Sequence, residues 1–145
     1  MKLYNEDCLN VLPTIPKKSV NLIITSPPYN IGINYNNYKD KRDDYVYWLS
    51  NVLNECCRVL KDNGHLFINL LSGKIDPFTS YKIAENVKWK LQNNIIWAKA
   101  IEIDGFVRGY STPTPSKRYL QSGWEHLFHF TKDGNTEVDL ESSGV

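Results

Sequence analysis

Four stretches of the chain are nearly continuous in apolar residues, many of them β-branched or aromatic. In chain order they read "SVNLIITSP", "HLFINLL", "NNIIWAKA" and "WEHLFHFTK". Such runs are typical of strands that form the core of a sheet. A shorter strand is expected at Lys2–Glu6, before a brief helix that starts at Asp7 and that Pro13 and Pro16 end.

Apolar residues recur at helical spacing between these runs. The stretch 43–60 predicts an amphipathic helix that Asp43 or Asp44 caps and that Gly64 ends. The dipeptide Asp76-Pro77 opens a second helix, which is expected to run to about residue 90. Residues 30–42 and 101–123 have the composition of loops, and the first of these is expected to be mobile.

The alternation of strands and helices predicts an α/β sheet with crossover helices. In such sheets ligands bind beyond the carboxyl ends of the strands. Two polar features stand at such ends, namely Asp7 after the first predicted strand and "TSPPYN" after the second. The candidate chemistry of this chain is therefore expected there.

The composition restricts the possible classes of protein but does not identify a function. The chain of 145 residues fits one domain, with 41% apolar residues and a net charge of +1. Cys8, Cys56 and Cys57 lack metal-site spacing and predict reduced core thiols in a cytoplasmic protein. The start has no secretion-signal pattern, and no apolar run is long enough to span a membrane, so no membrane partner is expected.

The stretch Ser26-Pro27-Pro28-Tyr29 suggests a chemical role. Adjacent prolines stiffen the backbone and set the direction of its carbonyls. The Ser26 hydroxyl and the Pro27 carbonyl can then accept hydrogen bonds from an exocyclic NH2, which keeps the nitrogen lone pair aimed at an electrophile. Tyr29 can stack on the same base, which reaches such a pocket only after it leaves the duplex. In isolation, however, Ser-Pro-Pro-Tyr also fits a plain turn.

With its surroundings, "TSPPYN" resembles the catalytic motif of S-adenosylmethionine-dependent DNA amino-methyltransferases. The similarity runs from about residue 2 to residue 132 and includes "GHLFINL", "NNIIWAKA" and "WEHLFHFTK". It implies a Rossmann-like sheet, double-stranded DNA as partner, and an amine pocket formed by Ser26, Pro27, Pro28 and Tyr29. It also implies that Asp7 approaches the adenosine of the cofactor, although Glu6 stands where the family often has glycine. Asn30 would line the cofactor or the base.

The chain lacks the glycine-rich cofactor turn of this family, often written D-x-F-x-G-x-G. Since only 25 residues precede Ser26, the order resembles the permuted beta class, in which the catalytic half comes first. We therefore expect a partial methyltransferase sheet, truncated or split, with a catalytic half at residues 1–132 and a polar, flexible tail at 133–145. Such a chain should self-associate or need a complementary half, and should be inactive alone.

A serine before Pro-Pro resembles the cytosine-specific branch, while an aspartate is commoner in the adenine branch. The first expectation is thus a site-specific methyltransferase acting on cytosine, or else adenine, in a restriction-modification system with a cognate endonuclease. A second is an inactive remnant or a DNA-binding subunit that needs a cofactor-binding chain. A third, methylation of a protein amide or of RNA, fits less well because those relatives have Asn-Pro-Pro-Tyr after their glycine loop.

Other polar and aromatic residues carry weaker expectations. Lys39, Lys41 and Arg42 follow the motif, where they either contact DNA phosphates or belong to a solvated loop. Lys117 and Arg118 invite the same reading. His126 and His129 lie three apart on a predicted strand and so face opposite sides, which favours structural roles over a metal site even with Glu125 beside them. Trp97 and Trp124 are expected in the core.

Overall fold

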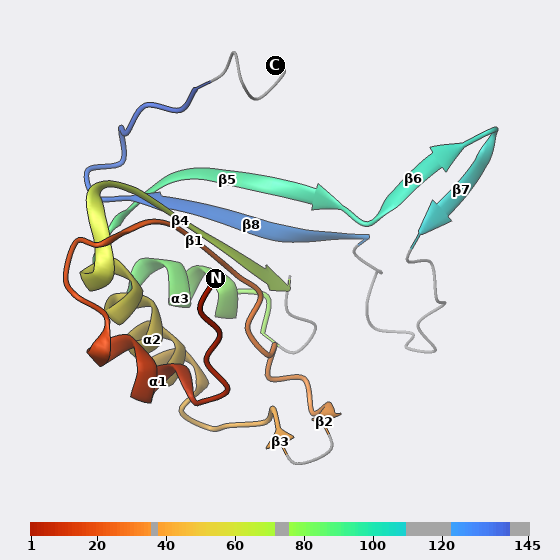
Figure 1. Cartoon of the computed structure of the whole chain (residues 1–145). Helices are drawn as coiled ribbons and strands as arrows, with labels where there is room; N and C mark the ends of the chain where they lie inside the picture. The colour runs from red at the N-terminus through yellow and green to blue at the C-terminus, as the bar shows by residue number, and fades with distance from the viewer. Residues whose placement is uncertain (36–37, 72–75, 110–122, 140–145) are drawn as a thin grey trace.

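A computed structural model of the chain describes residues 1–35, 38–71, 76–109 and 123–139. Its centre is a four-stranded sheet in the order β1, β4, β8, β5 (Figure 1). The strands are β1 (Val20–Thr25), β4 (Leu60–Leu71), β8 (Trp124–Thr131) and β5 (Lys90–Ala98). β1 runs parallel to β4, whereas β8 is antiparallel to both of its neighbours. This mixed sheet confirms the predicted α/β class and the four apolar runs.

The helices are α1 (Cys8–Val11), the 3-10 turn η1 (Leu12–Thr14), α2 (Tyr45–Val59) and α3 (Thr79–Glu85). Figure 1 shows them gathered on one side of the sheet. The core lies where alternate strand residues such as Leu66 and Phe128 meet α2 residues such as Leu53, all with no exposed surface. Fully burying one such side chain stabilises the fold by about 1.5–3 kcal/mol.

The turn from α2 into β4 differs from the expected glycine stop. The helix ends at Val59 because Leu60 is already extended, at φ −69° and ψ 143°, and begins the strand at once. Gly64 lies inside β4. A Cβ there would come within 2.9 Å of the Lys61 carbonyl oxygen and 3.1 Å of the Asn21 carbonyl oxygen. This glycine therefore permits close backbone approach beside β1.

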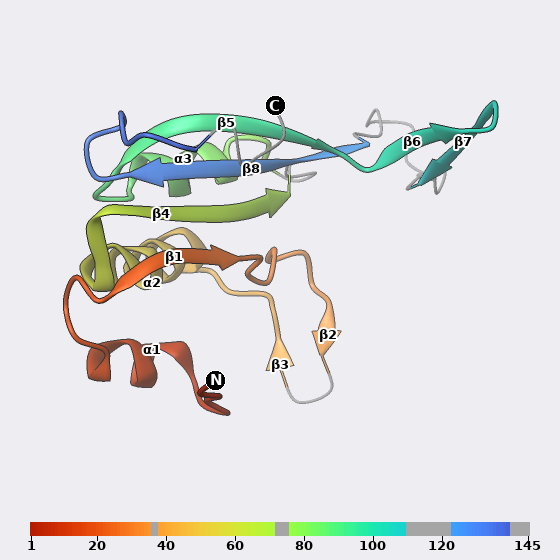
Figure 2. The ribbon, with the colours of Figure 1, turned by 45° about the horizontal axis from the view of Figure 1, so that its top comes forward.

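Residues 100–109 form a hairpin where a loop was expected. β6 (Ala100–Ile103) pairs with β7 (Phe106–Gly109) across a two-residue turn. Asp104 and Gly105 both have left-handed φ angles, +54° and +77°, as the Asp-Gly signal for such a turn requires. Figure 2 shows the hairpin extending beyond the end of the sheet. Lys117 and Arg118 lie outside the described residues.

The first predicted strand is wrong. Residues 2–6 are irregular and exposed, and in the described part of the chain the sheet neighbour of β1 is β4 alone. The short helix after Asp7 is confirmed, since the Asp7 carboxylate accepts a hydrogen bond from the Leu9 backbone N–H at 2.8 Å. Without a strand partner, residues 2–6 have nothing to hold them extended.

Two expectations about buried side chains also need correction. Trp97 is 50% exposed on the face of the sheet opposite the helices, and Cys8 is exposed. Cys56 and Cys57 are core thiols as expected, and burial raises the pKa of each to about 12. Sheet strands with one covered face leave the other to solvent, which the apolar run around Trp97 does not reveal.

Two segments are shorter or better anchored than their sequence indicated. The second long helix was expected to reach residue 90, but α3 ends at Glu85 and β5 starts at Lys90. Beyond β8, Thr136 exchanges two hydrogen bonds with Gln92, at 2.8 and 2.9 Å. The division of the chain at residue 132 stays a prediction.

In the described residues, no helix has the length and apolar character needed to cross a membrane.

Candidate functional site

The Ser-Pro-Pro-Tyr corner begins where β1 ends at Thr25. Because β1 and β4 are parallel, with Thr25 opposite Ile68, the corner lies beside the next β4 residue, Asn69. Ser26 is exposed and Tyr29 is half-buried, so the corner forms part of the surface. The motif therefore stands at the carboxyl end of a parallel strand, as expected from the sequence.

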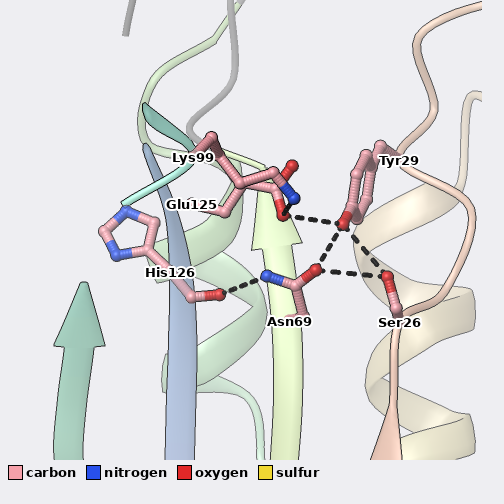
Figure 3. A network of polar contacts seen from close by, with 6 residues as sticks. All are labelled: Ser26, Tyr29, Asn69, Lys99, Glu125 and His126. Carbon is pink, nitrogen blue, oxygen red and sulfur yellow. Dashed lines mark hydrogen bonds and ion pairs between the residues drawn. The ribbon is translucent and has the colours of Figure 1, made fainter. Parts of the chain in front are cut away.

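Side chains of β4 and β8 meet those of the corner after β1 in one polar network (Figure 3). The Tyr29 hydroxyl donates to Oδ1 of Asn69 at 2.6 Å, and the Ser26 hydroxyl donates to the same oxygen at 3.2 Å. The two hydroxyl oxygens lie 3.0 Å apart. Asn69 is 5% exposed, so this buried amide holds both hydroxyls against the sheet.

A buried carboxylate completes the network from β8. Glu125 is 8% exposed, and its Oε2 lies 3.4 Å from the Tyr29 hydroxyl and 3.1 Å from Nζ of Lys99. The Lys99 ammonium also lies over the Trp97 ring, 4.0 Å from its centroid. Burial and, to a smaller degree, the Glu125 charge raise the pKa of Tyr29, although the bond from Ser26 lowers it. The phenol is therefore neutral at physiological pH.

The diproline step is anchored from the helix side. Tyr45, in the first turn of α2, is 4% exposed and donates from its hydroxyl to the Pro28 carbonyl oxygen at 2.6 Å. This bond sets the direction of the peptide group in the middle of the corner. The stiffness expected from two prolines is thus reinforced by a core residue.

A cavity of about 360 Å³ opens beside the corner. Its walls come from the corner, from the loop before α2 and from the start of α3, and they include Tyr29, Asn30, Lys41, Arg42, Tyr45 and Thr79. Its volume lies in the usual range of small-molecule pockets, about 300–1,000 Å³. The cavity combines two tyrosines, two basic side chains, two carboxylates and several other hydrogen-bonding groups.

The loop after the corner is closed by paired polar contacts. Asn30 has a left-handed φ of +59°, and its amide bonds both backbone groups of Arg42, at 2.6 and 3.1 Å. Asp40, 1% exposed, accepts from the backbone N–H groups of Ile31 and Gly32 at 3.0 and 2.8 Å. These bonds secure both ends of a loop that composition alone indicated to be mobile.

The three basic residues of this loop lie in different settings. Arg42 forms a two-point ion pair with Asp44, at 3.0 and 3.1 Å, and lies over the Trp48 ring. Lys41 lines the cavity, and Lys39, in the short strand β3 (Tyr38–Lys39), is exposed. β3 pairs with β2 (Asn34–Tyr35) within the same loop. Asp7 belongs to neither the corner network nor the loop contacts.

A sequence profile of the DNA methylase family N6_N4_Mtase matches residues 20–143. The chain belongs to this family. The type II methyltransferase M.MjaVI of Methanocaldococcus jannaschii is 40% identical over 103 residues, which are 66% of this chain and 52% of that protein. The DNA adenine methyltransferase YhdJ of Escherichia coli is 31% identical over 133 residues, 90% of this chain and 41% of that protein.

Solved structures place this DNA methylase chain in the same fold. The cytosine-N4-specific PvuII DNA methyltransferase superposes with a TM-score of 0.67 at 18% identity, covering 97% of this chain and 52% of that one. The M1.HpyAVI–SAM complex gives a TM-score of 0.53 at 20% identity, covering 90% and 54%. The chain thus spans about half the length of these relatives. Family and fold confirm the resemblance drawn from the corner, while the permuted order stays a prediction.

Three members of the DNA methylase corner were missed by sequence reasoning, namely Asn69, Lys99 and Glu125. Asn69 is the one amide within the apolar run "HLFINLL", and Glu125 opens the last strand; each is a polar residue in an otherwise apolar strand. Polar residues in apolar strands are buried only with hydrogen-bond partners, and this pattern could have indicated Asn69 and Glu125. Their partners could not be named without the strand register.

The histidines of the DNA methylase chain lie on opposite faces of β8, as expected. His126 stacks on Phe128 on the helix side, whereas His129 stacks on Phe67 and lies 3.0 Å from a ring nitrogen of His65. Each also contacts a β5 asparagine, Asn94 or Asn93. Within the described ranges, no group of three or more His, Cys, Asp or Glu side chains is arranged to hold a metal ion.

Proposed function

We propose that this chain supplies the catalytic corner of an S-adenosylmethionine-dependent DNA amino-methyltransferase. The observation that carries the proposal is the pair of hydroxyls, Ser26 and Tyr29, held by Asn69 at the carboxyl ends of adjacent parallel strands and beside a cavity. Family membership and relatives named as DNA methyltransferases support it. The DNA substrate implies a cytoplasmic enzyme.

The reaction proposed is direct attack by the exocyclic amine of a flipped base. S-adenosylmethionine, when bound, supplies an electrophilic methyl group. The chain's own residues orient the amine: Ser26 and the Pro27 carbonyl accept its N–H bonds, and Tyr29 presents its ring to the base. Because the amine becomes cationic as it reacts, acceptors already pointed at it stabilise the transition state. No covalent bond to the protein is needed.

The target base proposed is cytosine, with adenine second. The serine at the first position of the motif favours cytosine, and the PvuII DNA methyltransferase, which has a similar fold, is named cytosine-N4-specific. One curated relative is named an adenine methyltransferase, which keeps adenine as the runner-up. Several relatives are named type II methyltransferases, so a cognate restriction endonuclease is the proposed partner in the cell.

For the cofactor, the exposed Asp7 carboxylate has the chemistry of an acceptor for a ribose hydroxyl. It lies at the start of α1, where its Oδ1 also caps the helix. The Asn30 amide is engaged on both sides by Arg42, so its proposed role is to close the loop that lines the cavity. A direct contact from Asn30 to cofactor or base stays a prediction, as do phosphate contacts from Lys39, Lys41 and Arg42.

One observation favours the second candidate, a subunit that acts only with a complementary chain. Among the described residues β1 has one sheet neighbour, and its Leu22 and Ile24 side chains are 50% and 69% exposed. An open strand edge with apolar side chains is a surface for further pairing. A complementary polypeptide carrying the glycine turn would cover it, and self-association would be the alternative.

The decisive experiment measures transfer of labelled methyl groups from S-adenosylmethionine to duplex DNA, by this chain alone and mixed with a separately expressed glycine-turn half of a relative. Mass spectrometry of the digested DNA would identify the methylated base, with N4-methylcytosine expected. Ser26→Ala should lower turnover far more than DNA affinity, and equal losses would contradict the role of Ser26. Calorimetry that finds no cofactor binding in either sample would favour a non-catalytic remnant.

A further inference from the structure

The orientation of the Asn69 side chain is fixed by the backbone of β8. Its Nδ2 donates to the His126 carbonyl oxygen at 3.0 Å, and a carbonyl oxygen can only accept. Asn69 is 5% exposed, so water does not compete for this bond. Oδ1 must therefore face the opposite way, toward Ser26 and Tyr29 (Figure 3).

This orientation decides where the hydroxyl protons go. Ser26 and Tyr29 each carry one O–H proton. Oδ1 of Asn69 and Oε2 of Glu125 are both acceptors, and they lie 2.6 and 3.4 Å from the Tyr29 oxygen. The network thus holds two hydroxyl protons and two acceptor groups that face them from the sheet. Both protons are used inside the network, and the lone pairs of Ser26 and Tyr29 are left for whatever binds at the corner.

Lys99 contacts the same carboxylate oxygen that faces Tyr29. A carboxylate has only acceptor oxygens, so Glu125 can accept from both groups. The Lys99 ammonium lies 3.1 Å from Oε2 and donates to this oxygen. The donor and acceptor roles in the network are therefore set by Asn69, Glu125 and Lys99. None of these residues belongs to the Ser-Pro-Pro-Tyr motif.

We propose that Asn69 and Glu125 are positioning residues that make the corner a receptor for hydrogen-bond donors. The corner would bind the NH2 group of an aminopyrimidine or aminopurine and reject a carbonyl oxygen in the same place, because oxygen lone pairs would then face each other. This inference rests on the proposed function and adds the chemical basis by which the site distinguishes an amino base from an oxo base. A site built to pair one hydrogen-bonding group discriminates strongly against its mismatch.

The first test uses the chain alone and needs no activity. The phenol of Tyr29 is titrated by NMR in protein with isotopically labelled tyrosine, and Tyr29→Phe assigns its signal. Glu125→Gln removes a neighbouring negative charge, so the pKa of Tyr29 should fall, whereas Glu85→Gln, at the exposed end of α3, should leave it unchanged. An unchanged Tyr29 titration in Glu125→Gln would show that the contact is absent and would overturn the proposal.

The second test compares two substitutions of Asn69 in the methylating mixture described above. Asn69→Asp keeps an acceptor for both hydroxyls but loses the donor to the His126 carbonyl oxygen, so it should retain more of the turnover than Asn69→Leu. Asn69→Leu removes it and should lower kcat on the order of 10²-fold, as loss of one preorganised polar group does elsewhere. The KM for DNA should stay nearly constant in both. Asn63→Leu, at an exposed position of β4, is the matched control.

The outcomes separate this inference from the proposed function. Equal activity of the Asp and Leu variants would overturn the positioning role while leaving methyl transfer intact. If no mixture transfers methyl groups, the proposed function fails, and the Tyr29 titration still decides whether Glu125 faces the phenol. Circular dichroism of both Asn69 variants shows whether a loss of turnover reflects unfolding.

Discussion

The hydroxyl of Tyr29 lies 2.6 Å from Oδ1 of Asn69, across 40 residues of sequence. This contact exists because β1 and β4 are parallel, so the corner after one strand lies beside the end of the other. The bond is short for a hydroxyl donor and joins two part-buried groups. The corner is thus positioned by the sheet as well as by its two prolines.

Tyr29→Phe tests this relationship directly. The variant keeps the aromatic ring and removes the donor to Asn69, whose Oδ1 still accepts from Ser26. We expect a loss of about 1 kcal/mol in the free energy of unfolding, the usual net value of one hydrogen bond. In a methylating mixture kcat should fall while DNA affinity is kept. Tyr47→Phe, at a side chain 71% exposed, is the control for removing a hydroxyl.

Substitution of Arg58 should change the stability of the fold alone. From the last turn of α2 its guanidinium donates to the carbonyl oxygens of Leu12 and Ile15, at 2.6 and 3.1 Å, and pairs with Glu55 at 2.7 Å. Arg58→Met keeps the aliphatic stem and removes the charged donor to both carbonyl oxygens, of which that of Leu12 still accepts from the Ile15 N–H at 3.0 Å. The free energy of unfolding in urea should fall by about 1.5–3 kcal/mol, as for hydrogen bonds to charged groups.

A matched surface ion pair gives the comparison for Arg58. Lys82 pairs with Asp76 at 2.7 Å, but the two side chains are 55% and 39% exposed. Lys82→Met should therefore cost less than about 1 kcal/mol. If the Arg58 and Lys82 variants lose the same amount, the guanidinium does not tie the segment before β1 to α2.

Stability should depend on pH through two buried imidazoles. Burial lowers the pKa of His126, and burial together with the His65 charge lowers that of His129. The unfolded chain, with imidazoles near their usual pKa of about 6.5, then binds protons that the folded chain does not. The stabilisation is complete above about pH 6.5 and is lost as the pH falls through the lowered values.

Urea unfolding on both sides of this pH range checks the sign. The free energy of unfolding should decrease on acidification before the carboxylates titrate. A His126→Gln, His129→Gln double variant should show a flatter dependence even if it is less stable throughout. An equally steep slope in the variant would assign the pH dependence to other groups.

The long elements were predictable because their patterns are strong and local. Apolar residues at helical spacing defined α2, and two apolar runs defined β4 and β8. The strand predicted at residues 2–6 failed because a strand needs a neighbour, which five residues of sequence do not reveal. The β6–β7 hairpin was missed although Asp104-Gly105 marks its turn, because the whole stretch 101–123 was judged by composition.

The candidate site, like the fold, could be predicted only in part. Ser26 and Tyr29 could be found from the motif, and their placement at a strand end followed from the α/β pattern. Glu125 could not be connected to Tyr29, because that contact depends on β8 lying antiparallel beside β4 with Leu71 opposite Glu125. Nor could Asn30 be recognised as the residue that closes the loop on Arg42, because composition does not predict its left-handed backbone conformation.

The open edge of β1 leads to the last prediction. Ile24, 69% exposed, projects from a strand that has one sheet neighbour among the described residues. Because unpaired strand edges with apolar side chains favour association, the chain should form dimers or larger species as its concentration rises in sedimentation experiments. Ile24→Lys should shift this equilibrium toward monomer, since a lysine on an edge strand opposes pairing.

Phe78→Lys, at a position 65% exposed just before α3, controls for loss of an exposed apolar side chain elsewhere. A wild-type chain that stays monomeric at every concentration and melts at high temperature would show that this edge needs no partner, and would remove the structural argument for a complementary half.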